Sequence, residues 1–215
     1  MTLSNEATRV VFVHGLWMTG ADMWWLRRRV KRDGFSVKQF SYPTVRCNVK
    51  QNAARLNDFL KQYGSDVDVI HLVGHSLGGL VIRQLFHDYP EQKPGRIVTL
   101  GTPHRGSAIA HIFNRNRVGR WILGNSIECG LLGNVAPWLG ERELGVIAGT
   151  KDHGIDRVFC ALPRPNDGTV AVEETCCDGM TDHLQLPVAH SSMLLSREVA
   201  RQVIHFLRQG TFARL

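Results

Sequence analysis

Residues 67–79, Val-Asp-Val-Ile-His-Leu-Val-Gly-His-Ser-Leu-Gly-Gly, hold the pattern that decides the fold. The β-branched run at the start predicts a strand, and the apolar spacing from Leu77 onward predicts a helix. Between them lies the pattern G-x-S-x-G, with Ser76 at the centre of a sharp turn. Bulky residues two positions to either side would clash in that turn, and Gly74 and Gly78 avoid the clash. We therefore expect the Ser76 hydroxyl to stand above the sheet as a nucleophile, facing the positive end of the helix dipole.

Strand and helix patterns alternate through the rest of the chain. Short runs that are β-branched or have period two predict strands at 9–13, 35–41, 96–100, 144–148 and 183–188. Apolar positions at helical spacing predict helices at 21–32, 50–63, 77–87 and 192–207. Strands joined by helices pair in parallel with right-handed crossovers, so we expect an α/β fold. Its form would be a three-layer α/β/α sandwich with about six mainly parallel strands.

The chain has the size and composition of one globular domain. It has 215 residues, of which 43% are hydrophobic and 21% are charged. We expect a single domain over residues 1–215, with a cap or insertion at 103–142 where the alternation breaks down. Residues 151–179 also have a loop-like composition. Both irregular segments follow the ends of predicted strands, where open α/β sheets build their sites.

A second motif, Val-His-Gly-Leu-Trp at residues 13–17, directly follows the first predicted strand. Acyl transfer requires N–H groups directed at the oxyanion that forms on the attacked carbonyl. One donor in such sites is the residue after the nucleophile, here Leu77. The other comes from the loop after the first strand, where Gly15 lets the backbone turn and Leu16 presents its N–H.

A base and an acid that could activate Ser76 follow it along the chain, the acid first. His190 lies just after the last predicted strand, and from that loop an imidazole can reach the serine hydroxyl. The other histidines beyond the fifth predicted strand are His153, His183 and His205. Spacing leaves the acid open between Asp152 and Asp167, with Asp178 and Asp182 as further alternatives.

At these motifs the chain resembles the α/β-hydrolases of the small bacterial lipase/esterase type, close to the PGAP1-like branch. The resemblance spans residues 10–207 and rests on Val-His-Gly-Leu at 13–16, Gly-His-Ser-Leu-Gly-Gly at 74–79, Gly-Thr-Pro-His-Arg-Gly-Ser at 101–107, Asn-Asp-Gly-Thr-Val at 166–170 and Val-Ala-His at 188–190. It implies Ser76 as nucleophile, Asp167 as acid and His190 as base, with the N–H groups of Leu16 and Leu77 as oxyanion hole. It also implies that the chain starts at the third strand of the full fold and lacks the large apolar lid of interfacial lipases.

The resemblance implies a serine hydrolase that cleaves carboxylic esters through an acyl-enzyme intermediate. No metal or organic cofactor is expected, because such a triad and oxyanion hole carry the chemistry. A thioesterase, amidase or acyltransferase would use the same groups, and a non-catalytic binding module of this fold is the alternative from another class. The expected partner is a small-molecule acyl ester, and we expect Trp17, Trp121 and Trp138 to line its pocket.

The chain is basic, with 26 basic and 19 acidic residues and a net charge of +7. The basic runs 27–32 and 115–120 are typical of solvated helix faces, and they also allow contact with a membrane surface or an anionic substrate. No nucleic-acid-binding motif is present. The polar N-terminus and the absence of a CxxC pattern predict a cytoplasmic protein, with any membrane contact peripheral. The cysteines are Cys47, Cys129, Cys160, Cys176 and Cys177.

Overall fold

The computed structural model describes residues 7–140, 142–153 and 162–214, and contains a six-stranded sheet in the order β2-β1-β3-β4-β5-β6. All neighbouring strands pair in parallel. The strands are β1 (Thr8–Val13), β2 (Ser36–Phe40), β3 (Val69–His75), β4 (Ile97–Leu100), β5 (Leu144–Gly149) and β6 (Asp182–Leu186). The chain order reverses between β1 and β3, and open α/β sheets bind ligands at the carboxyl ends of the strands beside such a reversal.

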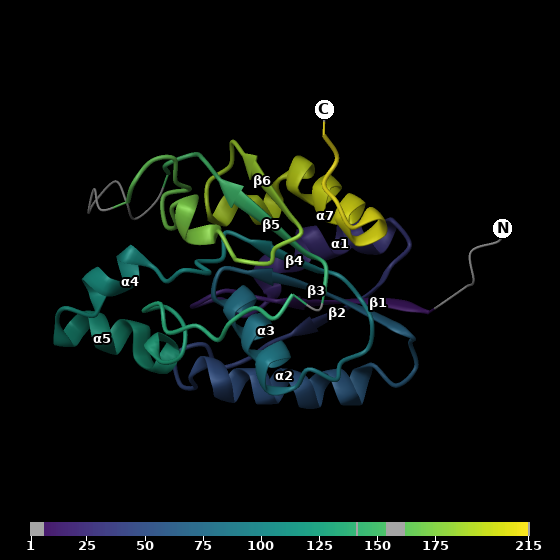
Figure 1. Cartoon of the computed structure of the whole chain (residues 1–215), viewed down its shortest axis with the longest axis horizontal. Coiled ribbons are helices and arrows are strands. Elements are labelled where there is room, and N and C mark those ends of the chain that lie inside the picture. The colour runs from purple at the N-terminus through teal and green to yellow at the C-terminus, as the bar shows by residue number, and fades with distance from the viewer. Residues whose placement is uncertain (1–6, 141, 154–161, 215) are drawn as a thin grey trace.

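Helices cover both faces of the sheet, as Figure 1 shows. Along β1 the side chains alternate, because successive residues of a strand point to opposite faces. Val10 and Phe12 join one core cluster with α1 and α7, whereas Val11 and Val13 join the other with α2 and α3. These helices are α1 (Trp24–Arg32), α2 (Val49–Tyr63), α3 (Leu77–Asp88) and α7 (Arg197–Gln209). The three layers confirm the predicted sandwich.

Two predicted helices each consist of a short 3-10 turn followed by an α-helix. The segment at 21–32 begins with η1 (Ala21–Met23) before α1. The closing segment begins with η4 (Ser191–Leu195), and α7 starts only after it. The Ser196 side chain causes this second break, because its hydroxyl accepts the Val199 N–H at 3.3 Å and caps α7.

The segment at 103–142 forms α4 (Ala108–Phe113), α5 (Arg117–Leu123) and η2 (Gly124–Ile127), with irregular chain around them. In Figure 1, α4 and α5 lie at the end of the molecule toward which the strands run. A further 3-10 turn, η3 (Glu173–Thr175), lies in the loop before β6. The irregular segments thus border the carboxyl end of the sheet.

Four of the cysteines, Cys47, Cys129, Cys176 and Cys177, are free thiols, whereas Cys160 lies outside the described residues. Part of the predicted loop at 151–179 also lies outside them. Within the described part of the chain, no helix combines the length and the hydropathy needed to cross a bilayer.

Candidate active site

Ser76 occupies the turn between β3 and α3 in a strained backbone conformation. Its φ is 52° and its ψ is −123°, a region that residues with a side chain rarely adopt. The turn is fixed from both sides, because the Ser76 N–H donates to the Leu100 carbonyl and the Thr102 hydroxyl donates to the Ser76 carbonyl, each at 2.9 Å. A Cβ at Gly74 would lie 2.8 Å from the Gly79 nitrogen. One at Gly78 would collide with the Val13 carbonyl, so both glycines permit this close packing.

His190 and Asp167 form a buried pair. The His190 Nδ1 lies 2.7 Å from Asp167 Oδ2, with Asp167 fully buried. The other carboxylate oxygen, Oδ1, accepts the N–H groups of Thr169 at 2.9 Å and Val170 at 2.7 Å. The main chain adds a bond from the His190 N–H to the Asp167 carbonyl at 3.0 Å. Both Asp167 oxygens thus have hydrogen-bond partners. The carboxylate holds the His190 imidazole in one orientation and leaves the His190 Nε2 free of this pair.

Ser76 and His190 line one cavity of about 280 Å³ at the carboxyl end of the sheet. The loop after β1 contributes Leu16 and Trp17 to its wall. Most of the remaining wall is apolar and comes from the segment around α4 and α5: Pro103, Ile109, Ala110, Phe113, Leu123 and Leu131. A predominantly apolar lining with a few converging polar groups is typical of a small-molecule site.

The amides of Leu16 and Leu77 are free to bind a ligand. Within the described residues, neither N–H donates to a protein acceptor. Leu77 is the first residue of α3, where helical N–H groups have no intrahelical partner. His14 anchors the loop that carries Leu16, because its ring stacks on Tyr42 at 4.5 Å and its carbonyl accepts the Tyr42 hydroxyl at 2.7 Å. Leu16, on the loop after β1, lines the cavity with Ser76, and Leu77 follows Ser76 at the start of α3.

The histidine before Ser76 is buried and neutral. Burial lowers the pKa of His75 to about 3, and the neighbouring His190 adds to this effect. The neutral ring donates its Nε2–H to the His190 carbonyl at 3.2 Å, with the two ring centroids 4.8 Å apart. His75 thereby ties the loop after β6 to the end of β3, a contact that no sequence pattern indicated.

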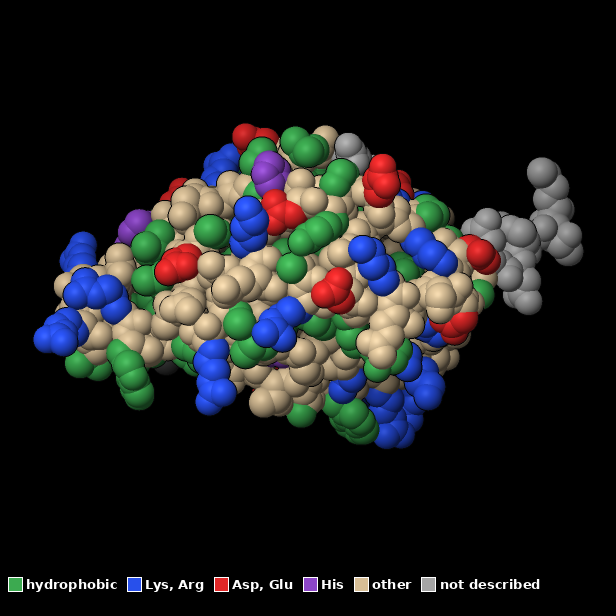
Figure 2. All heavy atoms as spheres, turned by 90° about the horizontal axis from the view of Figure 1, so that it is seen from below, with side chains coloured by type: hydrophobic (Ala, Val, Ile, Leu, Met, Phe, Trp, Pro, Cys, Tyr) green, Lys and Arg blue, Asp and Glu red, His purple; other side chains and the backbone are tan. Residues whose placement is uncertain are grey.

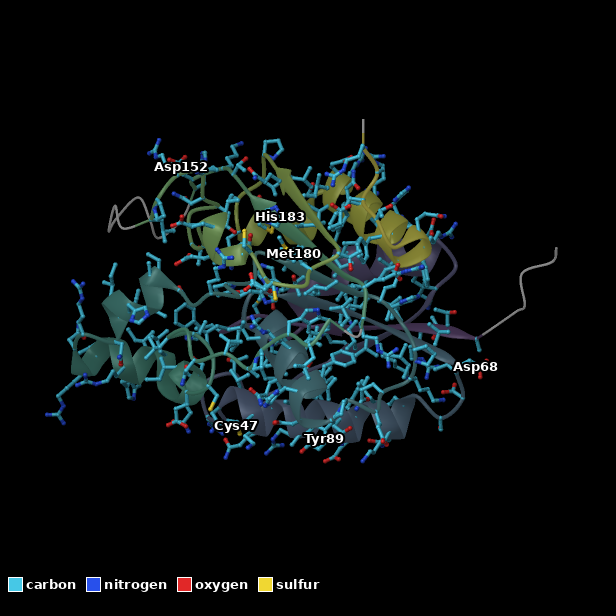
Figure 3. The ribbon with its side chains drawn as sticks, in the orientation of Figure 1. Cys47, Asp68, Tyr89, Asp152, Met180 and His183 are labelled. Atoms are coloured by element: carbon cyan, nitrogen blue, oxygen red, sulfur yellow. The ribbon has the colours of Figure 1, made fainter. Side chains whose placement is uncertain are left out.

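The other acidic candidates lie away from His190. Asp152 pairs with Arg164 at 2.9 Å, and Figure 3 shows it at the periphery of the sheet end. Asp178 pairs with Arg105, and Asp182 with Arg214. Asp167 is the acid that contacts His190.

The remaining histidine candidates also differ in their surroundings. His183 contacts the Thr175 hydroxyl at 3.0 Å, and His205 contacts the Thr211 carbonyl at 2.8 Å. His153 lines the cavity together with Ser76. In the described part of the chain, no three His, Cys, Asp or Glu side chains are grouped as metal ligands would be.

Of the predicted pocket tryptophans, Trp17 lines the cavity, and the expectation for the other two is wrong. Trp121 projects from α5 with 81% of its surface exposed. Trp138 packs edge-to-face on Phe86, with ring centroids 5.6 Å apart. The inward face of α5 carries Leu123 instead, since the helix points that side chain toward the cavity.

Comparisons with known proteins agree with this architecture. A family model described as a domain of unknown function (DUF7379) matches residues 4–126. No curated protein matches the sequence. The mature form of the Bacillus licheniformis lipase BlEst2 is similar in structure, with a TM-score of 0.76 and 20% identity over 97% of this chain and 94% of that chain.

Two further solved structures extend this likeness. Phospholipase PlaB from Legionella pneumophila has a TM-score of 0.70 and 16% identity over 95% of this chain and 60% of that chain. The Paleococcus ferrophilus monoacylglycerol lipase has a TM-score of 0.60 and 17% identity over 94% of each chain. At these identities the likeness establishes the fold, and it confirms the predicted minimal α/β-hydrolase architecture.

Proposed function

The chain belongs to the family described as a domain of unknown function (DUF7379), and we propose that it is a serine hydrolase that cleaves carboxylic esters. The observation that carries the proposal is one cavity lined by Ser76 on its strained turn and by His190 held on a buried carboxylate. A serine, an oriented imidazole and a buried acid are the groups that acyl transfer to a hydroxyl requires. That the solved structures compared above are lipases and a phospholipase also supports ester hydrolysis.

In the proposed first half-reaction, the Ser76 hydroxyl attacks the ester carbonyl. His190 Nε2 takes the hydroxyl proton, and the Asp167 carboxylate stabilises the imidazolium that forms. The N–H groups of Leu16 and Leu77 donate to the oxyanion of the tetrahedral intermediate. When the intermediate collapses, the bond to the alcohol oxygen breaks, and the imidazolium returns its proton to the departing alcohol.

In the second half-reaction, water attacks the acyl-Ser76 ester. His190 takes a proton from that water, and the same two amides stabilise the second oxyanion. Collapse releases the carboxylic acid and restores the serine hydroxyl. No step requires a group other than this chain and water.

The cavity supports a small-molecule acyl ester as substrate. Its volume of about 280 Å³ and its lining by Ile109, Phe113, Leu123 and Leu131 suit an apolar acyl chain of modest size. The proposal includes the PGAP1-like lipase/esterase affiliation, a single domain with residues 103–142 as its cap, and a cytoplasmic location with peripheral lipid contact. The motifs, the interrupted strand–helix alternation, the free cysteines and the basic runs support these parts.

Active-site labelling and a substrate series test the proposal. A fluorophosphonate probe is expected to label Ser76, and Ser76→Ala is expected to lose labelling and at least about 10⁴-fold in kcat on p-nitrophenyl esters. Parallel rates on matched ester, thioester and amide substrates separate an esterase from a thioesterase or amidase. A folded Ser76→Ala variant with wild-type turnover would contradict the assignment of the nucleophile.

A further inference from the structure

The end of the molecule formed by α4 and α5, residues 108–123, exposes large apolar side chains; we call it the α4–α5 tip. Trp121 is 81% exposed and Val118 is 67% exposed, both on α5. Leaving a tryptophan in water forgoes the burial of a large apolar ring, and tryptophan is the side chain that favours the boundary between water and lipid. The tip therefore has a surface suited to an apolar or interfacial partner.

The tip is also strongly basic. Residues 108–123 contain Arg115, Arg117 and Arg120 and no aspartate or glutamate. None of these three arginines forms an ion pair with an acid among the described residues. Figure 2 shows basic side chains gathered at this end of the molecule, with hydrophobic side chains beside them. The charge is complementary to an anionic surface.

A hollow of about 460 Å³ lies between α4 and α5. Its lining is mainly apolar, with Arg117 among the residues around it: Ile112, Phe113, Asn116, Arg117, Val118, Gly119 and Ile122. Gly119 allows the two helices to approach, because a Cβ there would collide with the Phe113 carbonyl. An apolar hollow beside arginines matches the two parts of an anionic lipid, an acyl chain and a phosphate.

The hollow adjoins the cavity that contains Ser76. Phe113 lines both spaces. Trp17, which lines the cavity, donates its ring N–H to the Ile122 carbonyl of α5 at 3.1 Å and is itself half exposed. A surface that contacts the tip would therefore lie next to the mouth of the cavity.

We propose that the α4–α5 tip docks on an anionic lipid surface. Trp121 and Val118 enter the headgroup region, and Arg115, Arg117 and Arg120 contact lipid phosphates. Docking deepens the proposed function, because it places the cavity where ester lipids are concentrated. Lipid binding can be measured without hydrolysis. An experiment can therefore contradict the docking proposal without contradicting the proposed hydrolase function, and the reverse.

A second basic face on α1 provides a matched control. Trp24 is 53% exposed there, and Arg27, Arg28, Lys31 and Arg32 surround another hollow. That hollow shares no lining residue with the Ser76 cavity. The α1 face is also basic and also exposes a tryptophan, but it does not line the Ser76 cavity, so it distinguishes a specific role of the tip from an effect of basic charge in general.

Vesicle co-sedimentation tests the docking surface. The protein is mixed with vesicles of phosphatidylcholine alone or of phosphatidylcholine mixed with the anionic lipid phosphatidylglycerol. Wild-type protein and Ser76→Ala are expected to bind the anionic vesicles and not the neutral ones. Arg115→Gln/Arg117→Gln is expected to bind about 25-fold more weakly, which is about fivefold for each lost charge. Arg28→Gln/Lys31→Gln, with the same charge loss, is expected to bind like the wild type.

A second measurement follows Trp121 directly. The difference in emission between wild type and Trp121→Phe is expected to shift to shorter wavelength on anionic vesicles. The hydrolysis of a short, water-soluble ester is expected to be equal in the wild type and the double arginine variant. The proposal is overturned if the wild type does not sediment with anionic vesicles, if both double variants lose binding equally, or if the Trp121 emission does not shift.

Discussion

Gly101 at the end of β4 lies directly against the imidazole of His190, since a Cβ added to Gly101 would be 2.9 Å from His190 Nδ1 and 3.0 Å from Asp167 Oδ2. The backbone at Gly101 also has a φ of +54°, which disfavours any residue with a side chain. The pair can approach the sheet this closely because the residue beneath it is glycine. The geometry of the site thus depends on Gly101, although Gly101 itself does not touch a substrate.

Gly101→Ala is expected to push the imidazole away from the Ser76 turn. A misplacement of about 1 Å at a catalytic group costs about 100-fold in rate, so we expect kcat to fall by about that factor. Gly34→Ala serves as the control, because Gly34 has a φ of +101° and no atom within 4 Å of an added Cβ. The Gly34→Ala variant should lose about 1 kcal/mol of stability and keep the kcat of the wild type. Equal kcat losses in both variants would show that backbone strain, and not contact with His190, is responsible.

Asp167→Asn is expected to reduce kcat on p-nitrophenyl esters by about 10⁴-fold, as in the comparable protease case, because an amide does not hold the productive imidazole tautomer. Asp152→Asn should change kcat little, since the Asp152 carboxylate pairs with the exposed Arg164 at the surface. Steady-state kinetics on both variants, with circular dichroism to verify folding, makes the comparison. A crippled Asp152 variant beside an active Asp167 variant would reverse the assignment.

Phe113→Ala is expected to join the hollow between α4 and α5 to the Ser76 cavity, because Phe113 lines both. The optimum in a chain-length series of p-nitrophenyl esters should then move to longer acyl chains. Each additional buried methylene contributes about 0.8 kcal/mol, or about fourfold in kcat/KM. Trp121→Ala should leave the profile on soluble esters unchanged, since this side chain faces solvent. A profile that responds to Trp121 and not to Phe113 would contradict the described cavity wall.

Three buried histidines are expected to make the protein sensitive to acid. Burial lowers the pKa of His71 to about 4 and the pKa values of His75 and His104 to about 3. Between about pH 6.5 and these values, the unfolded chain binds protons that the folded chain does not, so the free energy of unfolding falls as pH falls. Each histidine contributes about 1.4 kcal/mol per pH unit in that window, and the contribution is complete above it.

Urea unfolding at pH 7, 6 and 5 measures this slope. His104→Gln is expected to reduce the slope by about the contribution of one histidine, because glutamine does not titrate. The variant should still fold, since Gln can retain the contact with the Thr99 hydroxyl, which lies 3.0 Å from His104 Nε2. An unfolding free energy that does not change from pH 7 to pH 5 would show that these rings take up protons in the folded protein as readily as in the unfolded chain, and would contradict the lowered pKa values.

Much of the fold follows from local pattern. Apolar period and β-branched runs predict every strand of the sheet, because the four central strands β1, β3, β4 and β5 are almost entirely buried and the edge strands β2 and β6 each end in a buried residue. The pattern failed at the closing helix, where an amphipathic run continues across Ser196 and hides the cap that separates η4 from α7. Hydrophobic spacing indicates burial, and both pieces bury apolar side chains: Met193 and Leu194 in η4, and Val199, Val203 and Phe206 in α7. Leu195, at the end of η4, is exposed.

The candidate site was harder to predict from the sequence than the fold. The elbow pattern is local and pointed to Ser76, but Asp152 and Asp167 have equal standing in spacing alone. Only the folded loop, in which Asp167 accepts the N–H groups of Thr169 and Val170, brings one of them to His190. Trp121 was misjudged because α5 has just seven residues, too few to establish which face is inward. The catalytic roles themselves stay predictions.

The strained turn at Ser76 lowers the stability of the protein, while the proposed activity requires the serine. Selection for activity and selection for heat resistance therefore favour different residues at this position. A residue held at a φ of 52° costs on the order of 1–3 kcal/mol, and glycine there would relieve much of that cost. A library screened only for survival at high temperature would accordingly enrich the substitution Ser76→Gly and discard the nucleophile. A screen that also measures ester turnover would be needed to keep the serine at this position.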